Sequence, residues 1–373
     1  MYHAMIFITL LTFWQAGDKA EPGILVTLAG TGQRGYTGDG GAALKATLSE
    51  PFHCDVDKRG HLYIAEAMNH CIRRVDLKTG AISTVAGTGK KGYSGDGGKA
   101  TDATFNEPYA VAVDTDDNLY IVDRLNAVVR KVDAKTGIIS TIAGNGKKSY
   151  AGDGGKAVDA SMREPNDCCL DGKGGLLIAD VGDWRIRRLD LATGFITTFA
   201  GTGKAKITLK TKIDHATCGD NGPAHQAVVV GARAICVDGN GNTYICEREG
   251  SAIRKIDAKG IITTIAGTGE WGYAGDKADA KRAVFAGPKG LRCDRVGDIF
   301  VVDCENHCVR KIDAKTNLVT TVAGGRKGAG GDKGPATKAS MDRPHGCVID
   351  PNGVLYIADT NNHRVRKVVL GNQ

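Results

Sequence analysis

The chain has few aromatic residues and no long hydrophobic run. Phe, Trp and Tyr make up 6% of its 373 residues, although the net charge is +7. Proteins that bind single-stranded nucleic acid stack bases on exposed aromatic rings beside basic groups, so a basic charge without aromatics argues against such a partner. The most apolar stretch, residues 5–14, is too short to cross a bilayer. We therefore expect no nucleic-acid partner and no transmembrane segment in the mature chain.

Residues 1–20 have the composition of a secretory signal peptide. The apolar stretch is followed by the small residues Ala16, Gly17 and Ala20, which resemble a cleavage region. No Lys or Arg precedes the stretch, and a start assigned at the wrong codon explains that departure equally well. We expect residues 1–20 to be removed and the protein to be secreted or periplasmic.

The sequence contains eleven cysteines, an odd number, and most of them fall within apolar segments. Free cysteine packs as a small apolar residue, so core filling is the leading interpretation. A bridge between Cys236 and Cys246, on segments expected to pair, is the alternative.

Proline is scarce, and its positions are regular. Five of the nine prolines and one alanine recur at intervals of roughly 55 to 65 residues, the period of a repeat built from one small sheet. Each is followed by a short segment ending in Asp, a second ending in an acidic residue, and an Arg-Lys or Arg-Arg pair. The six positions are Pro51, Pro108, Pro165, Ala232, Pro288 and Pro344.

The first repeat predicts four antiparallel strands. Its apolar segments, residues 54–57, 62–66, 72–76 and 82–86, are separated by turn residues such as Gly60 and Gly80. Six units of this kind, each too small to bury its own core, predict an all-β fold, a six-bladed β-propeller with four-stranded blades.

The two ends of the chain complement each other. The sixth repeat stops near Val369 after its third strand, whereas residues 24–30 match the fourth-strand segments 82–87 and 138–144. We expect the N-terminal segment to complete the last blade, which closes the ring and removes open sheet edges. The prediction is a single propeller domain over residues 24–369, in a monomer.

One loop departs from the repeat. Residues 204–230 are longer than the matching loops and carry His215, Cys218 and His225. Elsewhere this loop is a glycine cluster, as at residues 92–98, which lacks the Lys-Ser ending of a phosphate-binding loop and is interpreted as a turn. The insertion is the least scaffold-like stretch and a candidate protein-binding face.

The third-strand segments carry the residues of a known repeat. The segment Asn69–Arg74, Asn-His-Cys-Ile-Arg-Arg, recurs as Asn306–Lys311 and Asn362–Lys367. With these segments the chain resembles NHL-repeat proteins over about residues 24–369. The resemblance implies the six-bladed propeller but selects no function, because such propellers include ligand-binding sensor domains, RNA- and protein-binding scaffolds, lyases and hydrolases. The repeated Asn-His pairs and acidic residues are expected to brace turns.

The residue after each repeated proline differs from one repeat to the next. The innermost strands of a propeller line its channel, so these side chains are expected to face one concavity at its mouth. Arg233 and Lys289 would place two positive charges together, which favours an anionic small molecule or peptide end. The first ring comprises Phe52, Tyr109, Asn166, Arg233, Lys289 and His345, and the next comprises His53, Ala110, Asp167, Ala234, Gly290 and Gly346.

A second interpretation is catalytic. Residues 343–346, Arg-Pro-His-Gly, resemble a phrase of virginiamycin B lyase-like propellers, which, like the peptidyl-amidoglycolate lyase propeller, hold a divalent metal over the channel through histidines. That resemblance implies one divalent metal on His345, His53 and Asp167. The fourth and fifth repeats depart from it, because they offer Arg and Lys where a further His is wanted.

Three functions stay open on the sequence alone. A ligand-binding propeller would use Arg233 and Lys289 together with Phe52, Asn166 and Asp167. A metal-assisted lyase or hydrolase would add His345, with Tyr109 or His53 as acid or base and the two cations stabilising negative charge. A protein-binding scaffold would instead use the loops or the insertion.

Overall fold

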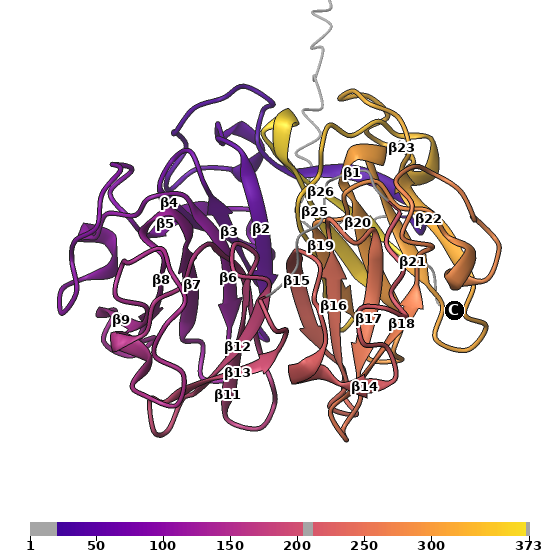
Figure 1. Cartoon of the computed structure of the whole chain (residues 1–373). Helices are drawn as coiled ribbons and strands as arrows, with labels where there is room; N and C mark the ends of the chain where they lie inside the picture. Colours follow the sequence, from indigo (N-terminus) through magenta and orange to yellow (C-terminus); the bar gives the residue numbers. More distant parts are fainter. Residues whose placement is uncertain (1–20, 204–211, 371–373) are drawn as a thin grey trace, which may run out of the picture.

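The computed structural model describes residues 21–203 and 212–370, and it is a six-bladed β-propeller (Figure 1). Figure 1 shows the first half of the chain on one side of the ring and the second half on the other. Each blade is an antiparallel sheet; the strands follow one another in chain order in blades 1, 2, 3 and 5, whereas β14 (Gly222–Pro223) in blade 4 and β1 (Ile24–Ala29) and β23 (Gly334–Pro335) in blade 6 are added out of order. The predicted fold class and blade composition are confirmed. The signal-peptide prediction for residues 1–20 lies outside the described residues.

The strands of the first three blades follow the repeat directly. Blade 1 contains β2 (Pro51–Val56), β3 (His61–Glu66), β4 (Cys71–Asp76) and β5 (Ile82–Ala86). Blade 2 contains β6 (Pro108–Val113), β7 (Leu119–Asp123), β8 (Val128–Val132) and β9 (Ile139–Ala143). Blade 3 contains β10 (Pro165–Leu170), β11 (Gly175–Asp180), β12 (Arg185–Asp190) and β13 (Ile196–Ala200).

Blades 4 and 6 each carry a short fifth strand at their outer edge. Blade 4 contains β15 (Ala232–Val237), β16 (Thr243–Glu247), β17 (Ala252–Ile256), β18 (Ile261–Ala266) and β14 (Gly222–Pro223). Blade 5 contains β19 (Gly290–Cys293), β20 (Ile299–Asp303), β21 (Cys308–Ile312) and β22 (Val319–Gly324). Blade 6 contains β24 (Cys347–Ile349), β25 (Val354–Asp359), β26 (Arg364–Val369), β1 (Ile24–Ala29) and β23 (Gly334–Pro335).

The helices of the described ranges are single 3₁₀ turns between strands, and none is long and apolar enough to span a membrane. They are Ala43–Lys45, Ala100–Asp102, Arg124–Asn126, Ala157–Asp159, Ala224–Gln226, Ala280–Arg282, Cys304–Asn306, Ala336–Lys338 and Thr360–Asn362.

Strand β1 closes the ring as predicted. It pairs antiparallel with β26, with Leu25 opposite Val368 and Thr27 opposite Arg366. Leu25 is fully buried in a core cluster with residues of blades 5 and 6. The first strand of the chain therefore completes the last blade, which leaves that blade without an open edge on this side.

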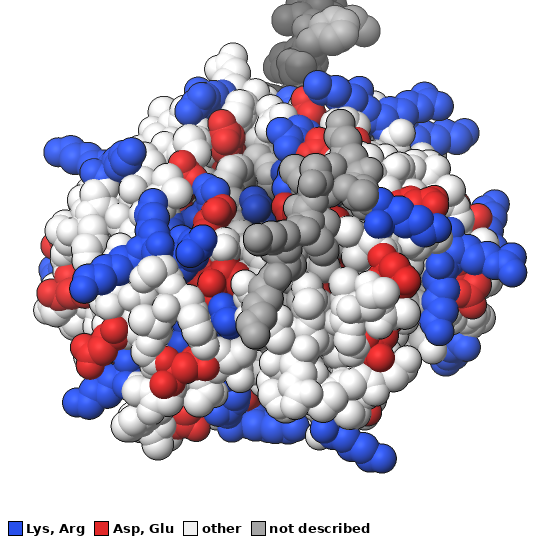
Figure 2. Space-filling model, in the orientation of Figure 1, with Lys and Arg blue, Asp and Glu red and all other residues white. Residues whose placement is uncertain are grey.

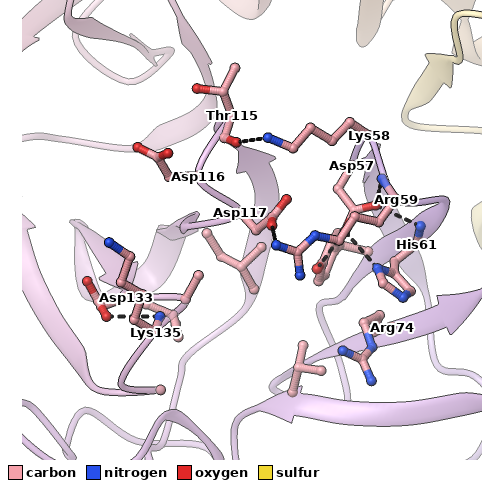
Figure 3. Close-up of a pocket in the computed structure, with 16 residues that line it drawn as sticks. Asp57, Lys58, Arg59, His61, Arg74, Thr115, Asp116, Asp117, Asp133 and Lys135 are labelled. Carbon is pink, nitrogen blue, oxygen red and sulfur yellow. Dashed lines mark hydrogen bonds and ion pairs between the residues drawn. The ribbon is translucent and has the colours of Figure 1, made fainter.

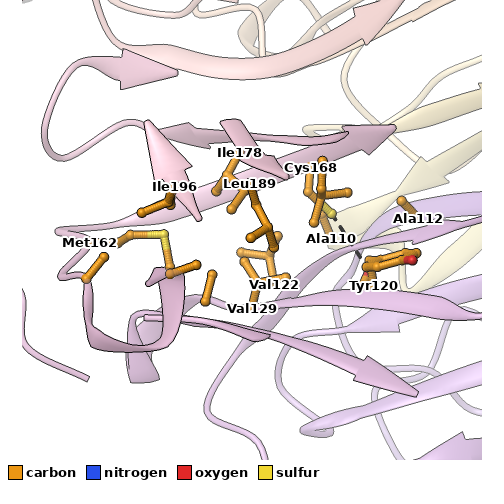
Figure 4. Close-up of a cluster of buried hydrophobic side chains, with 14 residues drawn as sticks. Ala110, Ala112, Tyr120, Val122, Val129, Met162, Cys168, Ile178, Leu189 and Ile196 are labelled. Carbon is orange, nitrogen blue, oxygen red and sulfur yellow. Dashed lines mark hydrogen bonds between the residues drawn. The ribbon is translucent and has the colours of Figure 1, made fainter. Parts of the chain in front are cut away.

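The core lies between the faces of neighbouring blades. Alternate residues of each strand face one side, so each blade presents an apolar face to the next. Figure 4 shows the cluster between blades 2 and 3, where the Cys168 thiol contacts the Tyr120 carbonyl at 3.7 Å. All eleven cysteines are free. The alternative Cys236–Cys246 bridge is not formed, because Cys236 lies opposite Tyr244 and Cys246 opposite Ala234.

The repeated polar residues hold the blades together. In blade 1 the fully buried Arg73 donates to Glu66 Oε1 at 3.1 Å, and Asn69 Nδ2 donates to Glu66 Oε2 at 2.6 Å. Burial raises the pKa of Glu66 to about 7, despite the opposing charge of Arg73. His70 Nδ1 accepts from the Glu107 backbone of the next blade at 3.3 Å. These residues brace turns and blade contacts, as the repetition predicts.

Candidate functional site

The first strand of blades 1 to 4 carries a β-bulge just after its first residue. The pairing register shifts between Pro51 and His53, and likewise at the matching positions of β6, β10 and β15. A bulge leaves one residue unpaired and redirects its side chain. The residues so placed are Phe52, Tyr109, Asn166 and Arg233.

The first ring fills the channel with side chains. The Phe52 ring lies 4.5 Å from the His345 ring and 4.6 Å from the Tyr109 ring, between centroids. Arg233 reaches from blade 4 to blade 2, where its Nη2 donates to the Tyr109 hydroxyl at 2.6 Å. Lys289 Nζ donates to His345 Nε2 at 2.9 Å. Five of the six predicted ring residues are thus brought together, in a packed layer rather than an open pocket.

Asn166, the sixth member, is fully buried but engaged locally. Its Nδ2 donates to the Glu164 carbonyl at 2.8 Å, and its Oδ1 has no partner among the described residues. Within the described part of the chain, it forms no hydrogen bond to the aromatic residues of the ring. Asn166 therefore lies beside the layer without linking blades.

His345 is held neutral in this layer. Burial lowers its pKa well below the ordinary value, and the charges of Lys289, Arg233, Arg343 and Arg248 lower it further. Because Nε2 accepts the Lys289 hydrogen bond, the imidazole proton must lie on Nδ1. That Nδ1 is buried and has no partner among the described residues.

Most cations around His345 are matched by carboxylates. Glu305 pairs with Arg343 at 2.6 Å and lies 3.6 Å from Lys289, and Arg248 pairs with Glu249 at 2.5 Å. Burial raises the pKa of Glu305, but the Arg343 hydrogen bond and the Lys289 charge outweigh burial and hold it below its usual value. Arg343 and Arg248 each have a carboxylate partner, and Lys289 shares Glu305 with Arg343.

Arg233 differs from these cations. Its guanidinium forms no ion pair with any carboxylate of the described residues, and its Nε is buried without a partner. Arg124 makes an informative comparison, since both guanidinium groups lie over the Tyr109 ring, at 5.1 Å for Arg233 and 5.4 Å for Arg124. Arg124 pairs with Glu107 and Glu164, each at 2.6 Å. Among the arginines around His345, Arg233 is thus the one without an ion pair to a described residue, and the charges of Glu249 and Glu164 act on it only from beyond ion-pair distance.

A second layer crosses the channel beneath the first. Arg292 of blade 5 reaches Asp167 of blade 3, with Nη1 to Oδ2 at 3.2 Å, and its Nη2 lies 3.4 Å from His53 Nδ1. Burial and the Arg292 charge lower the pKa of His53 to about 3. A Cβ at Gly346 would lie 2.6 Å from His53 Cδ2, so glycine is needed there for His53 to occupy this place.

Sequence reasoning missed Arg292 and the nearby Asp55. Both are two residues beyond the second ring of the repeat, on the same face of the inner strand. Burial raises the pKa of Asp55 to about 6, with Arg292 opposing. The sequence did contain a signal, because Asp55 and Arg292 are charged whereas the matching positions of the other four repeats are apolar. Those positions hold Ala112, Cys169, Cys236 and Val348.

The predicted metal ligands do not converge. His53 Nε2 lies 3.8 Å from Asp167 Oδ1, but His345 belongs to the upper layer, against Lys289. Asp167 also accepts hydrogen bonds from the backbone of Cys168 and Ile235. Within residues 21–203 and 212–370, no three His, Cys, Asp or Glu side chains form a metal-binding group. A metal on these residues stays a prediction without a supporting geometry.

The part of the insertion that the structure describes is tied to blade 4. His215 Nε2 lies 3.1 Å from Glu247 Oε2, where other blades place the asparagine of the repeat, because blade 4 has Gly250 at that position. A cavity of about 430 Å³ borders Lys212–Ala216. On the face of the molecule that Figure 2 shows, the Lys and Arg side chains are spread around the surface and are not gathered in one stripe.

Comparisons with known proteins agree with the fold. A family model described as the teneurin NHL domain matches residues 88–151 and 209–273, and the NHL repeat model matches residues 341–368. Protein SUPPRESSOR OF QUENCHING 1, chloroplastic, of Arabidopsis thaliana is 27% identical over 83% of this chain and 29% of its own length. NHL repeat-containing protein 2 of Gallus gallus is 26% identical over 92% of this chain and 51% of its own. The chain thus spans about half of one relative and less than a third of the other.

Solved structures share the propeller at low identity. An auxiliary nutrient binding protein from Bacteroides ovatus superposes with a TM-score of 0.64 at 15% identity, covering 92% of this chain and 76% of that one. Virginiamycin B lyase from Staphylococcus aureus superposes with a TM-score of 0.52 at 14% identity, covering 86% of this chain and 95% of that one. At such identities the likeness concerns the fold alone.

Proposed function

We propose that this chain, whose repeats resemble those of the NHL family, is a ligand-binding propeller that takes an anionic small molecule or peptide end at the mouth of its channel. Arg233 would provide the principal charge, and Lys289 would add a second donor. The anion would lie above the packed layer of Phe52, Tyr109 and His345. The auxiliary nutrient binding protein from Bacteroides ovatus, which shares the propeller, supports a binding role without identifying a ligand.

The observation that carries this proposal is the state of Arg233. A cation that is largely removed from water is costly unless an anion accompanies it. Every other arginine around His345 has a carboxylate within 4 Å, whereas Arg233 has only the neutral Tyr109 hydroxyl. An external carboxylate or phosphate would supply the missing charge and form charge-assisted hydrogen bonds.

The test is calorimetric titration with glutarate and with a tripeptide that has either a free or an amidated C-terminus. We expect the acids to bind and the amide not to bind. Arg233→Gln should weaken binding roughly tenfold or more, since it removes a charge-assisted hydrogen bond. Arg124→Gln is the matched control, because Arg124 contacts the same ring but is already paired. Equal losses in both variants, or no binding of either acid to the natural protein, would refute the proposal.

The alternative is a metal-assisted lyase or hydrolase at the same place. The neutral imidazole of His345 is the observation that favours it, because a metal ligand or general base must be unprotonated; a metal or a substrate proton would take the place of Lys289 at Nε2. Tyr109 and His53 would then be the acid or base. Elemental analysis of the natural protein and His345→Ala decides this: about one metal per chain that vanishes in the variant is expected for the enzyme, and no metal in either contradicts it.

Two further proposals concern a protein partner and the export of the protein. A scaffold role would place a protein partner on the loops or on the insertion, and it predicts partner binding that survives Arg233→Gln. Export remains a proposal based on residues 1–20; N-terminal sequencing of the protein recovered from its native source would find cleavage near residue 20 if it is correct.

A further inference from the structure

Two of the free thiols meet between blades 4 and 5, toward the lower end of the channel. Cys236 belongs to β15, the inner strand of blade 4, and Cys293 belongs to β19, the inner strand of blade 5. Both side chains pack in the core cluster that these two blades share. The two thiols are joined by a hydrogen bond. The fold therefore brings together two cysteines that are far apart in the sequence.

Contacts on both sides of Cys236 hold the two strands in this position. Arg292 Nη1 donates to the carbonyl of Ile235 at 3.2 Å, and the Cys293 thiol donates to the carbonyl of Val237 at 3.3 Å. Two consecutive residues of β19 thus bind the carbonyls that flank Cys236. A disulfide forms without a large backbone movement only where the two cysteines are already held close together. These contacts keep β19 against β15 at that place.

Cys169 provides the informative comparison. It occupies the same repeat position as Cys236, one blade earlier, and it is partly exposed, as Cys293 is. Its side chain packs against the core between blades 3 and 4, and its thiol donates to the Leu170 carbonyl at 3.2 Å. Cys169 therefore has similar access to solvent but belongs to a different cluster from the pair.

The two thiols of the pair differ in exposure and in acidity. Cys293 is partly exposed, whereas Cys236 is buried. The hydrogen bond from Cys236 and the charge of Arg292 hold the pKa of Cys293 below its ordinary value, although burial opposes them. Burial raises the pKa of Cys236 well above its ordinary value. Cys293 is thus the thiolate that an oxidant can reach, and Cys236 is the protonated thiol beside it.

We propose that Cys236 and Cys293 form a disulfide when hydrogen peroxide oxidises the protein. The Cys293 thiolate attacks one peroxide oxygen, so that an S–O bond forms, the O–O bond breaks, and the departing hydroxide takes a proton and leaves as water. Cys236 then attacks the sulfur of this sulfenic acid, so that the S–S bond forms, the S–O bond breaks, and a second water leaves with the Cys236 proton. The two sulfurs supply the two electrons that reduce the peroxide.

The disulfide would join blades 4 and 5 where their turns offer no ion pair. Figure 3 shows how blades 1 and 2 are joined at the same end of their inner strands: Arg59 of the β2–β3 turn pairs with Asp117 of the β6–β7 turn at 2.6 Å. The matching positions of blades 4 and 5 hold Asn240 and Gly297, neither of which carries a charge. The oxidised pair is therefore a link between blades that depends on peroxide. It is independent of the anion site proposed at the channel mouth.

The test is oxidation of the reduced full chain with a small excess of hydrogen peroxide, followed by alkylation of the remaining thiols, proteolysis and mass spectrometry. We expect a peptide that links Cys236 to Cys293 within one chain, and its loss after treatment with dithiothreitol. Trypsin leaves Cys246 on the same peptide as Cys236, between Arg233 and Arg248, so fragmentation of the linked peptide must assign the bond.

Two variants separate the steps. In Cys236→Ser the sulfenic acid on Cys293 has no thiol beside it, so we expect dimedone to trap it there in this variant and not in the natural protein. Cys169→Ser is the matched control, and the disulfide should form in it as in the natural protein. The proposal is overturned by the absence of the Cys236–Cys293 link after oxidation, by a link from Cys293 to another cysteine, or by equal formation of the link in protein unfolded in urea, which would show that the folded contact does not direct it.

Discussion

Replacing Arg292 by methionine removes the cation that crosses the lower channel. Asp167 would be left with a side chain 2% exposed to solvent and only two backbone amides as partners, those of Cys168 and Ile235. Breaking a buried ion pair by removing one member costs roughly 3–5 kcal/mol, because the remaining charge is uncompensated. We expect Arg292→Met to lower the free energy of unfolding by that amount.

A double-mutant cycle isolates the interaction. Asp167→Asn in the Arg292→Met background removes the stranded charge and should recover about half of the loss, roughly 2 kcal/mol, so the double variant should be clearly less destabilised than the two single variants added together. Urea unfolding followed by circular dichroism measures all four proteins. Arg59→Gln is the control: its side chain is 66% exposed, so losing its pair with Asp117 should cost less than about 1 kcal/mol. An Arg292→Met loss no larger than that of Arg59→Gln, or fully additive single effects, would refute the reasoning.

Two further predictions concern buried histidines. The pKa of His53 is lowered to about 3 in the folded protein, so its stabilising contribution is complete above the unfolded value near 6.5 and is lost as pH falls toward 3. Relative to His53→Asn, the natural protein should lose about 2 kcal/mol between pH 7 and pH 5, measured by urea unfolding, and parallel pH profiles would contradict this. His215→Ala should destabilise by roughly 1–3 kcal/mol because Glu247 loses a buried partner, and a change of less than about 0.5 kcal/mol in the same assay would contradict a stabilising role for this contact.

The sequence repeat predicted the scaffold well because each of the six repeats contains the same pattern of strand and turn residues. Pro51 and its counterparts fixed the inner strands, and residues 24–30 identified the closing strand, which β1 confirms. Side-chain reach was harder to predict. Arg233 and Arg292 each cross the channel to a non-adjacent blade, and this depends on the channel's width, which no single repeat encodes.

The substitute partner in blade 4 shows another limit. His215 takes the place of the missing asparagine, although it lies before the inner strand of its blade and follows no repeat spacing. The repeat pattern showed that blade 4 has Gly250 where an asparagine is expected, but it did not show which side chain takes the place of that asparagine.

The closing strand has a consequence for how the protein is made. Leu25 is translated long before its partner Val368. During synthesis β1 must wait without its sheet while the other five blades become available, and its unpaired backbone is a template for wrong pairing until β26 has been made. The completed ring in turn places the start of β1 beside the end of β26. Joining them by a short linker and opening the chain at an exposed turn elsewhere would give β1 its partner early in synthesis, and such a permuted protein should reach the native state with less aggregation.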